Sequence, residues 1–157
     1  MFKKDAEATE SIRPSAKEEI VSYQCDILIV DDEPIVGERL KAFIKKDGHR
    51  VETFVEPSAA LKRLEEKDFD IVISDIRMGE IDGIQVMQKV FQKSRRTKVI
   101  MITGYATLEL ARESMTKGAF DFIAKPFKLK EIRRTIEKAV KSLEKSDPRK
   151  TREAVGG

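Results

Sequence analysis

Five short apolar runs alternate with stretches of helical periodicity along this chain, and this alternation is the feature that most restricts its fold. The runs are rich in Val and Ile and cover residues 27–30, 51–55, 71–74, 99–103 and 120–124. Three of them are almost continuously apolar, which is typical of central strands buried on both faces. Strands that alternate with helices predict a parallel sheet covered by helices on both sides. The fold class that we expect is therefore α/β.

The segments between these runs show the spacing of amphipathic helices. The first helix is expected to begin at Pro34, which suits a first helical position, and to end before Gly48. Pro57 opens the second, and apolar residues recur at helical spacing within 84–91 and 129–143, the third and fifth. The fourth, at about 108–117, has the weakest apolar face. It is the helix that we expect to move or to contact a partner.

Length and composition are those of a single soluble domain. The chain has 157 residues, of which 40% are hydrophobic and 38% charged, so it can bury a core beneath a well-solvated surface. No run approaches the ~18 apolar residues of a membrane span, and the amino terminus lacks the apolar segment of a secretory signal. We therefore expect a cytoplasmic protein with no membrane partner. The single cysteine, Cys25, cannot form an internal disulfide and is expected to act as a small hydrophobe at a strand edge.

The chain divides by composition into three segments. Residues 1–24 form a polar extension that we expect to be mobile, residues 25–143 form the domain, and residues 144–157 form a charged tail. Their net charges are −1, +3 and +1, so the positive charge is not concentrated in any of them. Short basic groups such as Arg95-Arg96 are expected to be solvated surface. Without a basic stripe, direct binding of nucleic acid is not expected.

Polar residues occur at or just after the carboxyl ends of four predicted strands. They are Asp31 and Asp32, Asp75, Thr103 and Lys125. In open α/β sheets this edge is where ligands bind. Right-handed crossovers would place the first and third strands side by side, so the three aspartates would share one crevice. Three crowded carboxylates repel one another and call for a divalent cation. A site with few carboxylates and room for water and phosphate oxygens suits Mg²⁺.

A phosphoryl group is the ligand that this set of side chains would hold best. Phosphorylation of Asp75 would add about two negative charges, which Mg²⁺, Lys125 and the Thr103 hydroxyl could meet. Each residue alone also has an ordinary explanation. Asp32 or Asp82 could be a helix cap, Thr103 a strand-end residue and Lys125 a surface lysine. Their joint placement at four strand ends favours a site. The lone histidine, His49, has no metal-binding partner nearby in sequence and is expected to be exposed.

Four motifs in order resemble the receiver domains of response regulators in two-component signalling. They are Ile-Val-Asp31-Asp32-Glu33, Ser-Asp75-Ile-Arg-Met78, Thr103-Gly104-Tyr105 and Lys125-Pro126-Phe127, and the resemblance covers residues 25–143. It implies a doubly wound, flavodoxin-like sheet of five strands in the order 2-1-3-4-5 with five helices. The stretch 103–127 looks most like receivers that precede ATPase-type transcription activators, the NtrC-like subtype.

The resemblance also implies a role for each matching residue. Asp75 would be the phospho-acceptor, and Asp32 and the backbone carbonyl of Arg77 would bind Mg²⁺ together with it. Asp31 would act mainly through a metal-bound water. Lys125 would pair with the phosphoryl group, and the peptide bond between it and Pro126 would be cis.

The switch residues that the resemblance implies are Thr103 and Tyr105. Thr103 would bond to the phosphoryl group, and Tyr105 would be the aromatic residue that turns inward. The phosphoryl group would come from a sensor histidine kinase or a phosphotransfer protein. The response would alter the surface formed by the fourth helix, the fifth strand and the fifth helix, through which a phosphorylation-linked homodimer could form.

One position departs from the family pattern, because Gly79 follows Met78 where receivers usually have proline. Glycine frees the backbone there, so the loop beside the acceptor is expected to be more mobile.

Three other interpretations remain open. A phosphohydrolase would also use Asp75, although Arg77 stands where a second acid would be expected. A nucleotide-binding enzyme lacks its phosphate-binding motifs, and a degenerate receiver would have lost site residues that this chain retains.

Overall fold

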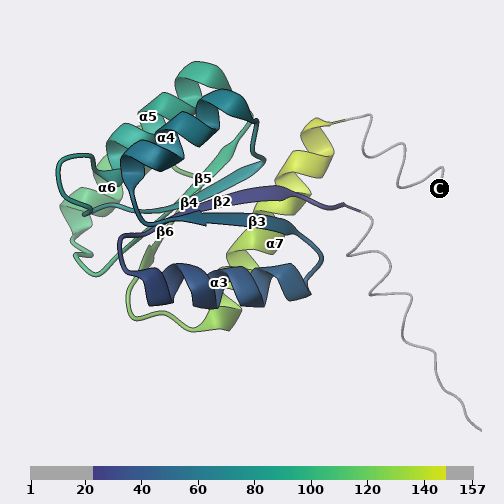
Figure 1. The fold of residues 1–157 in the computed structure, drawn as a ribbon, viewed down its shortest axis with the longest axis horizontal. Helices are drawn as coiled ribbons and strands as arrows, with labels where there is room; N and C mark the ends of the chain where they lie inside the picture. The colour runs from purple at the N-terminus through teal and green to yellow at the C-terminus, as the bar shows by residue number, and fades with distance from the viewer. Residues whose placement is uncertain (1–22, 148–157) are drawn as a thin grey trace, which may run out of the picture.

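The computed structural model describes residues 23–147, which form an open sheet of five parallel strands between two helical layers (Figure 1). The strands are β2 (Asp26–Val30), β3 (Arg50–Phe54), β4 (Ile71–Asp75), β5 (Lys98–Thr103) and β6 (Asp121–Ala124). They pair in the order β3-β2-β4-β5-β6. In sequence order this is 2-1-3-4-5, as the resemblance implied. The expected α/β class, strand order and number of helices are therefore confirmed for the described residues.

Among the described residues, five helices alternate with the strands and cover both faces of the sheet. They are α3 (Pro34–Lys46), α4 (Pro57–Glu66), α5 (Gly83–Lys93), α6 (Leu108–Thr116) and α7 (Leu129–Ser146). Helices α3 and α7 lie on one face, and α4, α5 and α6 on the other (Figure 1). Pro34 and Pro57 stand in the first turns of their helices, as expected, and Gly48 follows α3 with a φ of 98°.

Strand alternation divides the buried side chains into two cores, one on each face of the sheet. In β4, Ile71 and Ile73 pack toward α3 and α7, whereas Val72 packs toward α4 and α5. Helix α6 contributes least, because Ser114 is its only buried residue. The weak apolar face that the sequence predicted for this helix is therefore present in the structure.

The pole of the sheet at the amino ends of the strands holds a partly buried ionic cluster. Arg96 donates hydrogen bonds to Asp70 Oδ1 (3.1 Å), the Tyr23 hydroxyl (3.1 Å) and Asp147 Oδ2 (3.3 Å). One guanidinium thus ties the first described residues to the last turn of α7, and it is not the freely solvated side chain expected from the Arg95-Arg96 pair. Burial raises the pKa of Tyr23 to about 12, although Arg96 opposes this shift.

Two expectations from the sequence concern this pole, the bounds of the domain and the exposure of His49. The described residues run from Tyr23, which is buried, to Asp147, so they include positions on both sides of the domain expected at 25–143. His49 was expected to be exposed but is buried, since its Nδ1 accepts a hydrogen bond from the backbone N–H of Cys25 (3.1 Å). Cys25 is fully buried, as expected. The extension expected at 1–24 falls almost wholly outside the described residues, and so does the tail after Asp147.

Candidate functional site

The three aspartates singled out in the sequence meet at the carboxyl ends of β2 and β4. These strands are neighbours, with Val30 opposite Ser74. Asp31 and Asp75 are the next residues after these two, so they lie side by side at the same edge of the sheet. Carboxylate oxygens of Asp31, Asp32 and Asp75 all lie within 4.8 Å of one another. Asp31 and Asp75 are buried, with 1% and 5% of their surface exposed, whereas Asp32 faces solvent. The predicted crevice is therefore present, and it is open on the Asp32 side.

Lys125 reaches this cluster from the end of β6 and places its ammonium among three carboxylates. Its Nζ lies 2.9 Å from Asp75 Oδ2, 2.9 Å from Asp31 Oδ2 and 2.8 Å from Glu33 Oε1. The contacts to Asp75 and Glu33 are hydrogen bonds. The contact to Asp31 is an ion pair without hydrogen-bond geometry, because Asp31 Oδ2 is buried and accepts no hydrogen bond among the described residues. The peptide bond from Lys125 to Pro126 is cis, as the resemblance implied.

The charges in this crevice shift one another's ionisation. Burial raises the pKa of Asp31, and the backbone N–H of Glu33 and the ammonium of Lys125 offset only part of this shift. Burial would lower the pKa of Lys125, but its ion pairs with Glu33, Asp75 and Asp31 outweigh burial and hold that pKa above its usual value. The same lysine lowers the pKa of Glu33. Lys125 is thus a fixed cation at neutral pH.

The donor set fits a hard divalent cation. Three carboxylates converge with a buried oxygen of Asp31 that has no hydrogen-bond donor, and a single lysine does not neutralise them. Oxygen ligands with an open, solvated side suit Mg²⁺, which keeps several waters and binds phosphate oxygens well.

Thr103 and Tyr105 flank the crevice from the end of β5. The Thr103 hydroxyl is buried and accepts a hydrogen bond from the backbone N–H of Tyr105 (3.0 Å). The Tyr105 ring is 59% exposed and lies 4.1 Å beneath the Arg77 guanidinium, within the range of a cation–π contact. The two loops beside Asp75 are therefore joined above the site. An inward turn of Tyr105 would break this contact.

Two glycines shape the loop that follows Asp75. Gly83 packs so closely that a Cβ there would lie 2.4 Å from the Asp75 carbonyl oxygen. Its N–H donates to the Ile76 carbonyl (2.8 Å), which folds the loop back onto β4. Gly79 has a φ of 91°, a conformation that proline cannot adopt. Proline could therefore not take the place of Gly79 unless this loop changed its path.

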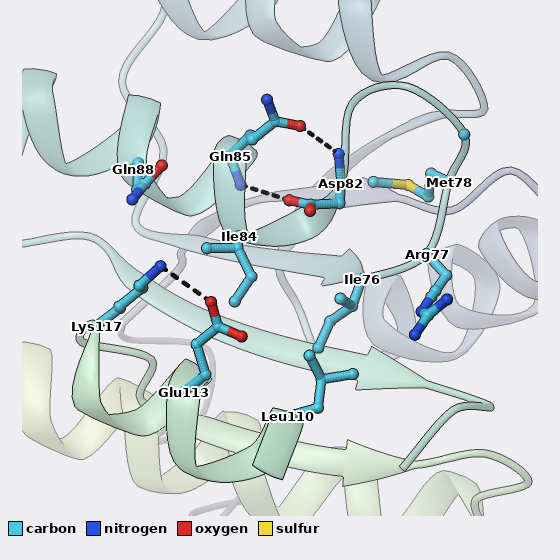
Figure 2. A pocket seen from close by; sticks show the side chains of 11 residues that line it. Ile76, Arg77, Met78, Asp82, Ile84, Gln85, Gln88, Leu110, Glu113 and Lys117 are labelled. Atoms are coloured by element: carbon cyan, nitrogen blue, oxygen red, sulfur yellow. Dashed lines mark hydrogen bonds and ion pairs between the residues drawn. The ribbon is translucent and has the colours of Figure 1, made fainter. Parts of the chain in front are cut away.

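A groove with a volume of about 720 Å³ runs between α5 and α6, beside the same loop (Figure 2). Ile76, Ile84 and Leu110 point toward one another in its floor, and the ion pair of Lys117 with Glu113 lies at its rim.

Asp82 caps α5 through reciprocal bonds with Gln85, so its ordinary interpretation as a helix cap is correct. Asp32 makes no such cap, since the residue that precedes α3 is Glu33.

Two residues near the site were not assigned by the sequence interpretation. Glu33 was quoted in a motif without a role, yet it is the third partner of Lys125. Phe122 lies in β6 opposite Met101, on the same sheet face as Thr103, and packs against the core beneath α6. Alternation along β5 and β6 could have placed Phe122 on this face. No sequence signal could have paired Glu33 with Lys125, 92 residues away.

Comparison with known proteins gives a family match over residues 27–137, described as the response regulator receiver domain. The chain belongs to this family. Receivers are phosphorylation-dependent switches of two-component signalling rather than conventional enzymes: they accept a phosphoryl group and interact with histidine kinases or phosphotransfer proteins. This match confirms the resemblance stated from the motifs.

The similar proteins are regulators of transcription and isolated receivers. Identity is 33% to the transcriptional regulatory protein ZraR of Klebsiella oxytoca, over 74% of this chain and 26% of that protein. It is 37% to the regulatory protein AtoC of Escherichia coli, over 73% of this chain and 25% of that protein. This receiver thus spans about a quarter of the length of these curated relatives. Its similarity to these regulators supports the NtrC-like subtype.

Solved structures agree with this assignment. A CheY-like receiver from Methanospirillum hungatei superposes with a TM-score of 0.74 at 29% identity, covering 78% of this chain and 98% of that chain. NtrX from Brucella abortus gives a TM-score of 0.73 at 27% identity, covering 78% of this chain and 28% of that chain. Between Tyr23 and Asp147, this receiver has no helix of sufficient length and apolarity to cross a membrane.

Proposed function

We propose that this receiver takes a phosphoryl group onto Asp75 from the histidine of a kinase or phosphotransfer protein, with Mg²⁺ as cofactor. The observation that carries the proposal is the position of the Asp75 carboxylate, 2.9 Å from the Lys125 ammonium and within 4.8 Å of oxygens of Asp31 and Asp32. A buried carboxylate between a fixed cation and a cation site is a nucleophile whose phosphorylated product is neutralised on both sides. The proposal includes the cytoplasmic location expected from the sequence.

The reaction is an in-line displacement at phosphorus. An oxygen of Asp75 forms a bond to phosphorus while the phosphorus–nitrogen bond of the donor breaks, and the imidazole leaves with a proton from solvent. Asp32, Asp75 and the Arg77 carbonyl would hold Mg²⁺, with Asp31 acting through a bound water. The cation would neutralise charge on the phosphoryl oxygens. Lys125 and Thr103 meet the remaining oxygens, and hydrolysis by water at the same phosphorus would reset the switch.

Transmission is expected to start at Thr103. A hydroxyl drawn to the phosphoryl group would give up its present bond from the Tyr105 N–H, and Tyr105 would turn inward as the loop before α6 moves. The surface that would change is formed by α6, β6 and α7, with Lys117, Asp121 and Lys128 on it. Leu108 and Met115 already expose apolar side chains on α6. This supports a phosphorylation-linked homodimer or another partner at this surface.

Phosphorylation is tested with a small phosphodonor such as acetyl phosphate and Mg²⁺, followed by intact mass. One phosphoryl group is expected on the parent protein and none on Asp75→Asn. Asp68→Asn, which removes an exposed aspartate that follows α4 and pairs with Lys93, should be phosphorylated like the parent. Incorporation that persists in Asp75→Asn would refute the assignment. Multiple turnover of a generic phosphate ester would indicate a phosphohydrolase instead.

Self-association is tested by sedimentation with and without the phosphoryl mimic beryllium fluoride. A mass increase is expected with the mimic, and Leu108→Lys should abolish it. Ile35→Lys is a matched control, because Ile35 is 70% exposed and Leu108 67%, but Ile35 lies on α3. A monomer in both states would leave only a heterologous partner for this surface.

A further inference from the structure

Three carboxylates already surround the ammonium of Lys125 in this structure. An ammonium carries three N–H bonds. Two are used in hydrogen bonds to Asp75 Oδ2 and Glu33 Oε1, and Asp31 Oδ2 lies 2.9 Å from the same nitrogen as an ion pair without a hydrogen bond. A phosphoryl group on Asp75 needs this lysine, since the new oxygens would otherwise lie in a crevice of carboxylates. A phosphoryl oxygen would be a fourth anionic partner of an ammonium that already has three within 2.9 Å, so one of the present partners is expected to give way.

Burial indicates which carboxylate leaves. The Asp31 side chain is fully buried, and its Oδ1 also accepts the backbone N–H of Glu33 (2.9 Å), so it cannot withdraw without moving the start of α3. Asp75 carries the phosphoryl group itself. The Glu33 side chain is 61% exposed, and hydration would replace its contact with Lys125 at little cost. Glu33 is the partner that can be released by rotation of its own side chain.

We infer that Glu33 is a positioning residue that holds Lys125 in the resting receiver and must release it when Asp75 is phosphorylated. This inference rests on the proposed function and adds a competitor to it. The Glu33 carboxylate and the incoming phosphoryl group compete for a hydrogen bond from the Lys125 ammonium. Glu33 therefore stabilises the unphosphorylated state, and its negative charge at the rim opposes an anionic phosphodonor.

The variant Glu33→Gln separates competition from simple support of the lysine. Glutamine keeps the length of the side chain and an acceptor oxygen but removes the charge. If Glu33 competes with the phosphoryl group, phosphorylation of Asp75 by phosphoramidate with Mg²⁺ should become roughly two- to fivefold faster, the range of an exposed ion pair. If Glu33 merely supports Lys125, the rate should fall. A slower or unchanged rate would overturn the inference.

Two control variants are available in the same chain. Glu56 precedes Pro57 at the start of α4, just as Glu33 precedes Pro34 at the start of α3, and neither side chain makes a cap bond. Glu56→Gln should leave the rate unchanged. Glu80→Gln removes an exposed charge from the loop beside Asp75 and measures the effect of the local field alone. If Glu80→Gln accelerated phosphorylation as much as Glu33→Gln does, the inference would be overturned.

A second measurement does not depend on the rate of phosphorylation. The side-chain NMR signals of Lys125 should differ between the parent and Glu33→Gln at rest, and should coincide once beryllium fluoride and Mg²⁺ are bound. A difference that persists in the bound state would show that Glu33 is not released. Absence of phosphoryl incorporation in the parent itself would refute the proposed function, whereas normal incorporation without acceleration in Glu33→Gln would refute only the role of Glu33.

Discussion

Asp31 and Asp32 are adjacent in sequence, but the structure gives them different environments. Asp31 is buried against Lys125, and Asp32 is exposed at the open side of the crevice. Only Asp32 can therefore contact a hydrated cation from the solvent side without first losing a lysine. This difference separates the roles of two chemically identical side chains.

Removal of the Asp32 charge is expected to weaken Mg²⁺ binding by at least about tenfold, because a site with so few carboxylates has no substitute ligand. Asp31→Asn should cause a smaller loss, since Asp31 is expected to act through a bound water. Calorimetric titration of both variants with Mg²⁺ is the measurement. Equal affinity of Asp32→Asn and the parent would remove Asp32 from the cation site.

Thr103→Ala should still accept a phosphoryl group on Asp75 but transmit it poorly. Mg²⁺ and Lys125 still neutralise the group, so incorporation by mass should be retained. The lost hydrogen bond to a charged group contributes about 1.5–3 kcal/mol, enough to shift a two-state equilibrium more than tenfold. The readout is the NMR environment of the Tyr105 ring before and after phosphorylation.

Phe122 provides a second ring on which to follow the same change. It lies on the sheet face that carries Thr103, whereas Tyr105 lies in solvent beneath Arg77. If the NMR signals of either ring shifted fully on phosphorylation of Thr103→Ala, Thr103 would not be the residue that transmits the change. If the Phe122 signals shifted in the parent and those of Tyr105 did not, the aromatic switch residue would be Phe122 in β6.

The positions of the site residues could be predicted because they depend on strand ends, which apolar runs define. Asp75 ends β4 and Thr103 ends β5, and both were placed from the sequence alone. The burial of His49 and the bond between Glu33 and Lys125 could not be predicted. Both depend on which side chains the folded sheet brings together across long sequence separations.

The turn from β4 into α5 depends on one close contact at the element scale. Gly83 begins α5, and its Cα lies against the backbone of Asp75 and Ile76. The sequence indicated a helix start here, through the cap at Asp82, but not the closeness of the packing. Backbone approach of this kind is a property of the assembled loop.

Gly83→Ala is expected to destabilise the receiver by about 1–3 kcal/mol, because the added Cβ would lie 2.4 Å from the Asp75 carbonyl oxygen and force the loop from β4. Gly104→Ala is the matched control, since a Cβ there has no neighbour within 4 Å. Urea denaturation measures both. Equal stability of the two variants would show that the loop can shift freely.

At the scale of the whole molecule, the receiver has two poles with different tasks. The carboxyl ends of the strands hold the proposed acceptor, Asp75, and the opposite pole holds Arg96 with Tyr23, Asp70 and Asp147, together with His49. Both ends of the described chain are fixed at this second pole. Chemistry at Asp75 and anchoring of the chain ends are thus separated by the length of the sheet, so a change at the second pole should affect stability without affecting phosphorylation.

His49 makes this separation testable through pH. Burial lowers the pKa of His49, although Asp47 and Asp70 oppose the shift. The unfolded chain, with a histidine pKa near 6.5, therefore binds a proton more readily than the folded protein. Above that pH the residue is neutral in both states and has no effect. As the pH falls below about 6.5, the unfolded chain binds a proton that the folded protein does not bind, and the free energy of unfolding falls.

The free energy of unfolding should therefore fall between pH 7 and pH 5 with a contribution from His49 of at most about 1.4 kcal/mol per pH unit. His49→Asn should remove this contribution, because asparagine can still accept the Cys25 N–H but does not titrate. The measurement is urea denaturation of both proteins across this range, with the difference between them isolating His49 from the carboxylates. Phosphorylation of Asp75 at pH 7 should be equal in both. A parent and variant with parallel pH profiles would show that His49 is not protonated differently in the two states.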